Sequence, residues 1–367
     1  MTPTSVRLFQ AELHYRPGLL VHTAVSGPVA FLTSLYLVVE DADGLRGVGE
    51  ARSNIAYVNG LSPDEVAAAA TRAVAGLPWP DGTPAVLAAA DRDAPAPVRA
   101  MVEAALHDAD ARQAGCGVCE LFGVAGGARR YHTNQSLFHG PADAMIEAAR
   151  GYVARGFRRL KVRLGIADRT ADRDFLMRLR DSVGPDVELA VDLNGAWAAG
   201  DVEAGLSAFA AAGLAYVEQP FAPDDWPAVA AFAHGTPVPV MLDETVSSPA
   251  AVDRVVAAGW RQMAHLKIVK LGGIDRVVAC GQRLRAAGIG VMVGQMNEGG
   301  VATAAAVHAA LALEPAHAEL YGADGLVDDP ASGLTYDTGT VRIDGAAGLG
   351  VAFDGARCRR TAEWTHD

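Results

Sequence analysis

Five charged residues lie at or near the ends of five successive apolar runs of the sequence: Lys161, Asp192, Glu218, Asp243 and Lys267. The successive intervals are 31, 26, 25 and 24 residues. An interval of this length accommodates one strand and one helix, so each charged residue takes the equivalent place on its own strand. When such units close into a barrel, the chemistry lies where the strands end. We therefore expect the five side chains to converge at one mouth.

Three of these residues, Asp192, Glu218 and Asp243, are carboxylates on neighbouring strands. Unpaired anions packed together repel one another and lose hydration. A divalent cation removes that cost, and a set of oxygen ligands favours Mg²⁺, with Mn²⁺ as the alternative. The sequence therefore predicts a metal site formed by these three residues.

Positive side chains flank the predicted metal site on two faces. Lys161 and Arg163 are two residues apart on one predicted strand, so both point to the same side. Lys267 belongs to a strand across the barrel. We expect the cation and the neighbouring positive charges to lower the pKa of the lysines towards that of a usable base. Such a base would remove a proton next to a carboxylate, and the metal would hold the charge of the resulting enediolate.

Eight short apolar runs alternate with helical stretches from Tyr131 onward. The runs cover residues 131–137, 157–164, 187–193, 214–218, 238–243, 263–268, 289–294 and 316–321. Eight βα units predict a parallel sheet closed into a TIM-type barrel. A doubly wound open sheet is the alternative, but no glycine-rich fingerprint follows the first run.

The first 125 or so residues follow a different pattern. Two β-like runs, Phe31 to Glu40 and Leu45 to Glu50, flank the turn Asp41-Ala-Asp-Gly44, which predicts a hairpin. Helical segments follow at 63–75, introduced by Ser62, and at 96–114. We therefore expect an α+β domain over residues 1–125 and a barrel domain over 126–345, with residues 346–367 packing back on the first domain.

The composition bounds the function classes. The 367 residues are 50% hydrophobic and 20% charged, which excludes global disorder. Lysine and arginine number 31 against 43 acidic residues, a net charge of −12, without a dense basic cluster, so we expect no nucleic-acid partner. Neither a signal peptide nor an 18-residue apolar stretch is present, so we expect no membrane span, and Val301 to Leu313 is predicted as a buried helix.

Four cysteines are present, two of them in Cys116-Gly-Val-Cys119. A zinc site needs two further ligands near such a pair, and none is visible, so we interpret these cysteines as small residues at a helix end. We expect a protein of the reducing cytoplasm.

The ordered motifs resemble the enolase superfamily, and within it the muconate lactonizing enzyme-like subgroup. The matching segments are Leu160-Lys-Val-Arg-Leu-Gly165, Asp192-Leu-Asn-Gly-Ala-Trp197, Glu218-Gln-Pro220, Asp243-Glu-Thr245, Leu266-Lys-Ile-Val-Lys-Leu-Gly-Gly273, Met292-Val-Gly-Gln-Met-Asn-Glu298, Glu319-Leu-Tyr-Gly322 and Gly348-Leu-Gly350. The resemblance implies a modified (β/α)₇β barrel with an N-terminal α+β capping domain. It also implies Mg²⁺ on the three carboxylates, acid/base lysines on strands 2 and 6, support of the metal site by Asn194 and Glu244, and a homo-oligomer, dimer or octamer.

Two features separate this chain from its neighbours in the superfamily. The mandelate racemase-like subgroup places a histidine at the end of strand 7, where this sequence has none; His265 and His308 fall elsewhere and are interpreted as packing or helix residues. The subgroup's strand 2 carries Lys-x-Lys, and its second lysine usually transfers the proton. Here that position is Arg163, which stays protonated, so the strand 2 base is either Lys161 or absent.

In this family the loops of the capping domain select the substrate, which indicates the segments Tyr15 to Ala30 and Arg52 to Gly60, with Arg52 and Tyr57 as candidate contacts. The candidates on the barrel side are Gln135, Gln295, Asn297, Glu298, Glu319 and Asp324. Dipeptide epimerases of the subgroup carry Asp-x-Asp on strand 8. Here the region reads Glu319-Leu-Tyr-Gly-Ala-Asp324, which is closer to the cycloisomerase pattern.

These observations predict a metal-dependent enzyme that removes the α-proton of a small carboxylate substrate. An isomerase, either a cycloisomerase or an epimerase, is the first choice. A dehydratase of acid sugars or hydroxy acids is the alternative. A third hypothesis is a binding protein that retains the metal site but has lost chemistry through Arg163.

Overall fold

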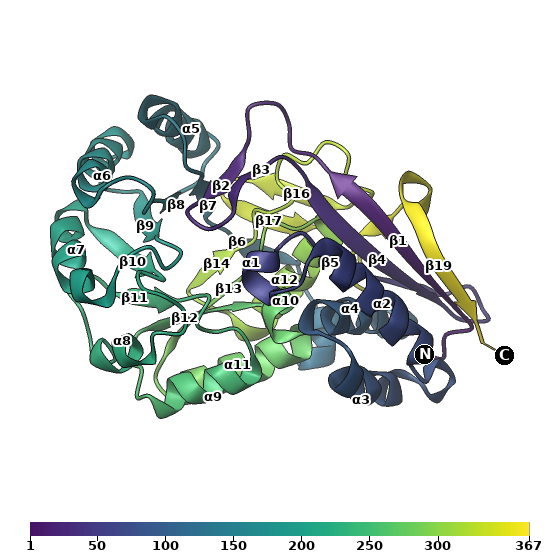
Figure 1. The fold of residues 1–367 in the computed structure, drawn as a ribbon. Coiled ribbons are helices and arrows are strands. Elements are labelled where there is room, and N and C mark those ends of the chain that lie inside the picture. Colours follow the sequence, from purple (N-terminus) through teal and green to yellow (C-terminus); the bar gives the residue numbers. More distant parts are fainter. Residues whose placement is uncertain (367) are drawn as a thin grey trace.

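An antiparallel sheet forms the centre of the N-terminal domain. The computed structural model describes residues 1–366, in which β1 (Ser5–Leu13), β4 (Leu32–Glu40) and β5 (Arg46–Arg52) form this sheet together with β19 (Arg359–Thr365) from the end of the chain. The predicted hairpin between β4 and β5 is confirmed: the Asp41 carboxylate accepts the N–H groups of Asp43 and Leu45. Because β19 returns to pair with β1, the two ends of the described chain lie side by side (Figure 1).

Three helices cover one face of this sheet: α2 (Pro63–Gly76), α3 (Thr83–Asp93) and α4 (Ala96–Ala114). The predicted start of α2 is confirmed, because Ser62 and Glu65 form a reciprocal capping box. Helix α4 lies close against β5. A Cβ at Gly47 would lie 2.1 Å from the carbonyl oxygen of Ala105, so glycine is what allows this approach.

Eight parallel strands form the barrel, and they neighbour one another in chain order. They are β7 (Gln135–Leu137), β8 (Arg159–Arg163), β9 (Glu188–Asp192), β10 (Leu214–Glu218), β11 (Val240–Leu242), β12 (Met263–Lys267), β13 (Gly290–Gly294) and β14 (His317–Glu319). A backbone hydrogen bond from Asn134 N–H to the Ala318 carbonyl joins the first strand's segment to the last.

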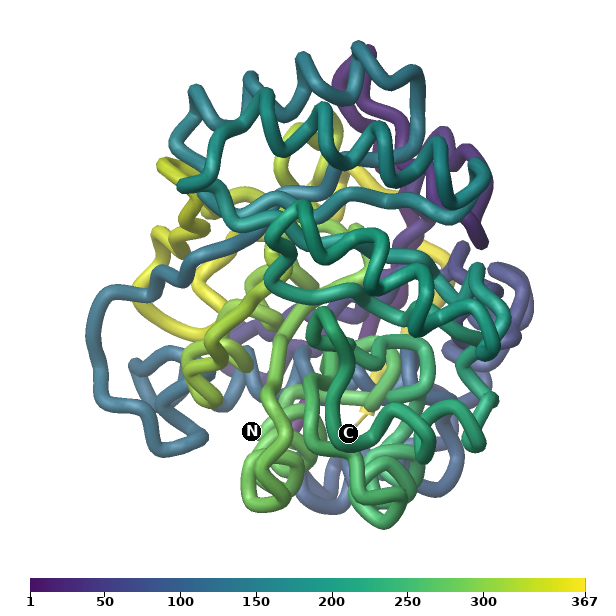
Figure 2. The backbone as a smooth tube through the Cα atoms, turned by 90° about the vertical axis from the view of Figure 1, so that its left-hand side faces the viewer, coloured from purple at the N-terminus to yellow at the C-terminus, as the bar shows by residue number. Residues whose placement is uncertain are grey.

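Helices connect the barrel strands and lie outside them (Figure 2). They are α5 (Ala142–Ala154), α6 (Arg169–Val183), α7 (Val202–Phe209), α8 (Trp226–Ala231), α9 (Pro249–Ala257), α10 (Ile268–Leu271), α11 (Ile274–Ala286) and α12 (Gly300–Leu313). Seven βα units followed by a final strand are a (β/α)₇β barrel, so the predicted fold is confirmed. The expected buried helix at 301–313 is α12.

The first predicted strand, residues 131–137, is wrong as a single element. It divides into β6 (Arg130–His132), which pairs with β17 (Thr340–Ile343), and β7, which enters the barrel. The chain changes partners between them, since Thr133 N–H donates to the carbonyl of Gly339 and Asn134 N–H donates to that of Ala318. An apolar run gives no indication of such a change of partner.

Small elements complete the fold: β2 (Val21–Thr23), β3 (Gly27–Val29), α1 (Ala56–Asn59), β15 (Ala331–Ser332), β16 (Leu334–Asp337) and β18 (Ala352–Phe353). The β2–β3 hairpin and α1 belong to the two capping-domain segments that face the barrel mouth. Within residues 1–366, no helix combines the length and the apolar character needed to cross a membrane.

Strand alternation separates the chemistry from the core. Leu160 and Val162 of β8 belong to the large apolar core, whereas Lys161 and Arg163, which alternate with them, point into the barrel. Below the polar residues, a separate apolar cluster of Ala190, Tyr216, Met241 and Met292 fills the barrel interior. The charged side chains therefore lie above an apolar floor.

Candidate active site

The three predicted carboxylates lie together at the barrel mouth. Asp192 and Glu218 end adjacent strands in register with each other, and Asp243 directly follows β11. All three are buried. The pKa of Asp192 is raised to about 6. Burial is the largest cause, and the carboxylates of Glu218 and Asp243 add to the rise, while Arg163 and Lys161 oppose it. The carboxylates therefore repel one another, and a cation would relieve this repulsion.

Positively charged side chains compensate part of the negative charge of the three carboxylates. Arg163 donates from Nη1 to Oδ2 of Asp192, and Nζ of Lys267 lies 2.7 Å from Oδ2 of Asp243. Burial raises the pKa of Asp243, but Lys267 and Lys270 outweigh it and hold the pKa well below its ordinary value. The three carboxylates are thus unequally compensated.

Lys161 reaches the cluster from β8. Its Nζ lies 2.5 Å from Glu319, 2.8 Å from Glu218 and 3.5 Å from Asp192. Lys267 reaches it from β12, four strands away around the sheet. Burial lowers the pKa of both lysines, but the surrounding carboxylates outweigh it and raise the pKa in each case. The direction is thus opposite to the lowering expected from the sequence, because the neighbouring carboxylates favour the charged form of each lysine.

Two polar residues surround the carboxylates. Asn194 donates its backbone N–H to Asp192 and its side-chain amide to Glu244, both at 2.9 Å. Burial, together with the charges of Asp243 and Asp192, raises the pKa of Glu244 to about 8. Oδ1 of Asn194 and Oε2 of Glu244 are buried without a hydrogen-bond partner in the described chain. Unpaired oxygens beside repelling carboxylates fit a site that holds a hydrated divalent cation.

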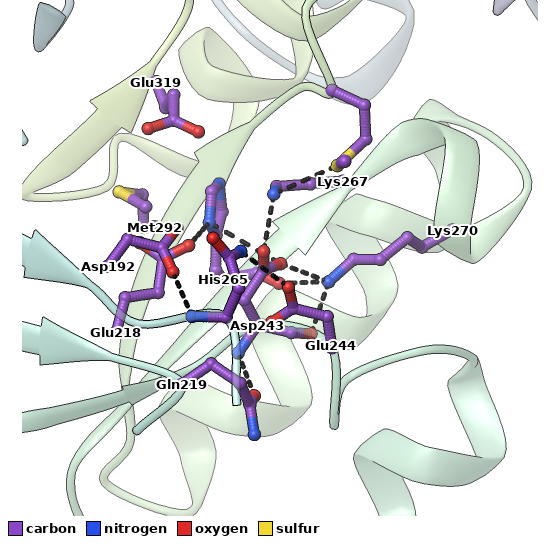
Figure 3. Close-up of polar contacts among 12 residues, drawn as sticks. Asp192, Glu218, Gln219, Asp243, Glu244, His265, Lys267, Lys270, Met292 and Glu319 are labelled. Atoms are coloured by element: carbon purple, nitrogen blue, oxygen red, sulfur yellow. Dashed lines mark hydrogen bonds and ion pairs between the residues drawn. The ribbon is translucent and has the colours of Figure 1, made fainter. Parts of the chain in front are cut away.

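Sequence reasoning missed three residues of this site. His265, interpreted from the sequence as a packing residue, has Nδ1 3.1 Å from Oε1 of Glu218 (Figure 3). Lys270 on α10 donates to the carboxylate and carbonyl oxygens of Asp243. Gln219 accepts the Asp243 N–H with its side-chain oxygen. Glu218, Asp243 and His265 bring one possible ligand atom each to within 4.8 Å of one another, a group that does not include Asp192.

The signals for these three residues were present in the sequence. His265 is two residues before Lys267 on one strand, so both point into the barrel. Lys270 follows Lys267 by three residues, and Gln219 directly follows Glu218. What the sequence lacks is the direction in which the chain turns after each strand.

A small cavity of about 20 Å³ lies beside the cluster, with room for about one water molecule. Its lining comes from the capping domain and the barrel together: Val21, Thr23, Tyr57, Arg163, Asn194, Asp243, Lys267, Gln295, Met296 and Asn297. The predicted substrate contacts Tyr57, Gln295 and Asn297 are therefore at the cavity. A carboxylate substrate needs more room than this cavity provides.

Four predicted substrate contacts lie elsewhere. Arg52 is fully buried and donates to the carbonyls of Met296 and Asn297, so its charge holds a loop. Asp324 pairs with Arg155 at 2.8 Å.

The other two are Gln135 and Glu298. Gln135 pairs in register with Leu160 and so points to the outer face of the barrel, whereas its neighbour Ser136 pairs with Lys161. Glu298 accepts the Met296 N–H and closes its own loop. Glu319 lies inside the barrel, but its carboxylate is engaged by Lys161.

Residues 144–357 match the sequence profile of the family described as Enolase C-terminal domain-like. This chain belongs to the enolase superfamily. The matched segment contains β8 to β14, and therefore every strand that carries a charged residue of the cluster.

Relatives with established names narrow the class. The L-Ala-D/L-Glu epimerase of Bacillus subtilis is 29% identical over 69% of this chain and 70% of its own length. Muconate cycloisomerase 1 of Pseudomonas putida is 28% identical over 90% of each chain. The crystal structure of the Bacillus cereus N-succinyl Arg/Lys racemase shares the fold, with a TM-score of 0.90, 97% coverage of each chain and 22% identity. All three are isomerases, so the predicted subgroup and the predicted enzyme class are confirmed.

Proposed function

We propose that this protein is a metal-dependent isomerase that moves the proton α to the carboxylate of a small substrate. The observation that carries the proposal is the buried group Asp192, Glu218 and Asp243, with Lys161 reaching it from β8 and Lys267 from β12. Substrate seated at this group would have a positively charged side chain on each face.

We infer that Asp192, Glu218 and Asp243 hold the cation, and that it is Mg²⁺, with Mn²⁺ as the alternative, because all three offer oxygen. When bound, the cation supplies positive charge that stabilises the negative charge developing on the substrate carboxylate as the α-proton leaves. Asn194 orients Asp192 and Glu244 through its two hydrogen bonds.

Lys267 is the residue to which we assign the proton transfer. Lys267 is one of the residues that line the cavity, and its amine can deliver or accept a proton at a carbon held there. From the β8 side the cavity is lined by Arg163, whereas Lys161 is engaged by Glu319 and Glu218. A guanidinium does not release its proton, so Arg163 binds and stabilises negative charge while Lys161 supplies positive charge.

The cavity supports a substrate without a free ammonium group. Its side chains are mostly neutral or positive, and Asp243 is the one acidic residue among the described residues that line it. Asp324, the acidic residue that follows β14, the last strand of the barrel, is paired with Arg155. Binding an ammonium group needs a free carboxylate. We therefore favour cycloisomerisation, or epimerisation of a carboxylate substrate that has no amino group or only an acylated one, over epimerisation of a dipeptide with a free ammonium group.

Other expectations remain proposals. Cys116, Cys119, Cys280 and Cys358 are all free thiols, which supports a reducing, cytoplasmic compartment. We retain the homo-oligomer, dimer or octamer, on family resemblance. We also retain the domain limits at residues 125 and 345, with the C-terminal segment belonging to the capping domain, which the pairing of β19 with β1 supports.

The proposal is tested by a screen of carboxylate libraries in deuterated solvent with Mg²⁺ present. An isomerase incorporates deuterium at the α-carbon of its substrate, and the exchange stops when the metal is chelated. If the protein only binds carboxylates, a ligand raises its melting temperature, but no α-proton of the ligand exchanges with the solvent.

A further inference from the structure

The ring of His265 lies inside the barrel between the Glu218 carboxylate and the backbone of β13. Nδ1 is 3.1 Å from Oε1 of Glu218, while Oε2 of the same carboxylate accepts from Lys161 at 2.8 Å. An ionised carboxylate only accepts hydrogen bonds, so Nδ1 carries the hydrogen and donates it. Each oxygen of Glu218 is therefore held by a different strand.

The chain makes room for this ring at one position. A Cβ at Gly294 would lie 2.1 Å from Nε2 of His265 and 3.0 Å from the Cβ of Glu319. The φ angle of Gly294 is not in the left-handed region, so the backbone alone does not require glycine here. Space for the imidazole is what a side chain at this position would remove.

Packing alone does not explain a histidine at this place. The His265 side chain is fully buried, and Nε2 has no hydrogen-bond partner among residues 1–366. Burial of a polar ring costs free energy that an apolar side chain of similar size would not incur. Asp243 lies 3.7 Å from Nδ1, too far for a hydrogen bond, so the contact with Glu218 is the ring's one side-chain hydrogen bond.

We propose that His265 is a positioning residue that holds the Glu218 carboxylate in the orientation a divalent cation requires. The inference rests on the proposed function, in which Glu218 is a metal ligand. A carboxylate free to rotate pays conformational entropy on binding the ion and presents the wrong oxygen part of the time. Loss of a hydrogen bond that orients a metal ligand costs about 10–100-fold in metal affinity.

Four variants of the full chain separate positioning from packing. His265→Leu fills the space but donates nothing, whereas His265→Asn keeps a donor at the same number of bonds from the backbone as Nδ1. Gly294→Ala displaces the ring without removing a polar group. His317→Asn is the matched control, since His317 is also on a barrel strand and contacts a glutamate, Glu188, 3.2 Å away at the strands' other end.

The readout is the dissociation constant of Mn²⁺ on metal-stripped protein, measured by titration calorimetry, with circular dichroism to confirm the fold. We expect His265→Leu and Gly294→Ala to bind Mn²⁺ about 10–100-fold more weakly than the wild type. His265→Asn should recover most of this loss, and His317→Asn should match the wild type. Unchanged affinity in His265→Leu, or equal loss in the leucine and asparagine variants, overturns the inference.

Two further results distinguish its failure from that of the proposed function. Spin-echo spectroscopy of bound Mn²⁺ detects a directly ligated imidazole nitrogen; such a signal, absent in His265→Asn, would make His265 a ligand and overturn the positioning role. If Glu218→Gln binds Mn²⁺ as tightly as the wild type, the proposed metal site itself is wrong, and the inference falls with it.

Discussion

Nζ of Lys267 lies 2.7 Å from Oδ2 of Asp243. The proposed proton-transfer group and a proposed metal ligand are thus in contact, and Sδ of Met296 covers the amine at 3.2 Å. A substrate carboxylate held by a cation on Asp243 would bring its α-carbon close to this amine, so distance as well as residue type supports Lys267 as the acid/base group.

Replacing Lys267 with alanine should lower turnover by about 10²–10⁴-fold, the contribution of a placed proton-transfer group. The fold should survive, because Lys270 still compensates Asp243. The measurement is kcat with a substrate found in the screen, alongside the thermal unfolding curve. Near-normal turnover in Lys267→Ala would exclude the assigned role.

Glu218→Gln should abolish Mg²⁺ binding and metal-dependent activity while the circular dichroism spectrum stays that of the wild type. The amide removes the negative charge that both the cation and Lys161 need. Glu188→Gln is the control, because Glu188 also belongs to a barrel strand but contacts Arg159 and His317 at the other end. Calorimetric titration with Mg²⁺ measures both variants, and equal loss in the two would indicate general damage to the barrel.

Arg163→Lys tests whether a single base operates. In the wild type Arg163 donates to Asp192 and cannot serve as a base, so we expect α-proton exchange with one enantiomer of a chiral substrate. A lysine at this position should add exchange with the other enantiomer. Exchange is followed by proton NMR in deuterated water, with Arg159→Lys on the same strand as control. Similar exchange of both enantiomers by the wild type contradicts the one-base account.

Glu50 predicts a pH dependence of stability away from the metal site. Its carboxylate accepts the N–H groups of Gly299 and Ala302 at 2.9 and 3.0 Å and joins β5 to the start of α12. Burial raises the pKa of Glu50 from 4.5 to about 8, with Asp329 adding to the rise. The folded chain therefore keeps a proton that the unfolded chain loses, and this stabilisation, complete below pH 4.5, disappears as the pH rises through 8.

The melting temperature should accordingly fall between about pH 4.5 and pH 8, and Glu50→Gln should show a smaller fall because it has no proton to lose. Glu12→Gln, an exposed position on β1, is the control and should keep the wild-type slope. Thermal unfolding across this pH range measures all three proteins. If the melting temperatures of the wild type and Glu50→Gln change equally with pH, Glu50 is not the cause of the pH dependence.

The strand ends were predictable because a barrel imposes one repeat on the sequence: the predicted β10 matches the structure, and Asp192, Glu218 and Asp243 meet at the mouth as their spacing indicates. It was harder to predict which of two neighbouring residues on a strand points into the barrel. Gln135 and Ser136 differ by one position, and only the register with β8 shows that Ser136 points inward.

Long-range partners were not predictable. Arg52 has the composition of a substrate contact, yet it is bound by carbonyls 244 and 245 residues away along the chain. Every residue has a backbone carbonyl, so the sequence does not indicate which carbonyls Arg52 will contact. His265 was missed for a related reason, because the space it needs is created on the next strand, at Gly294.

The most direct test of the central claim is the fate of the α-hydrogen of a turned-over carboxylate in deuterated water with Mg²⁺, followed by NMR and mass spectrometry. The account predicts one deuterium at the α-carbon, or at the carbon protonated in cycloisomerisation, no change in molecular formula otherwise, and no exchange with chelator or with Lys267→Ala. A product that has lost water would make the enzyme a dehydratase. Turnover that places no solvent deuterium in the product, or that proceeds unchanged without a divalent cation, would contradict the account.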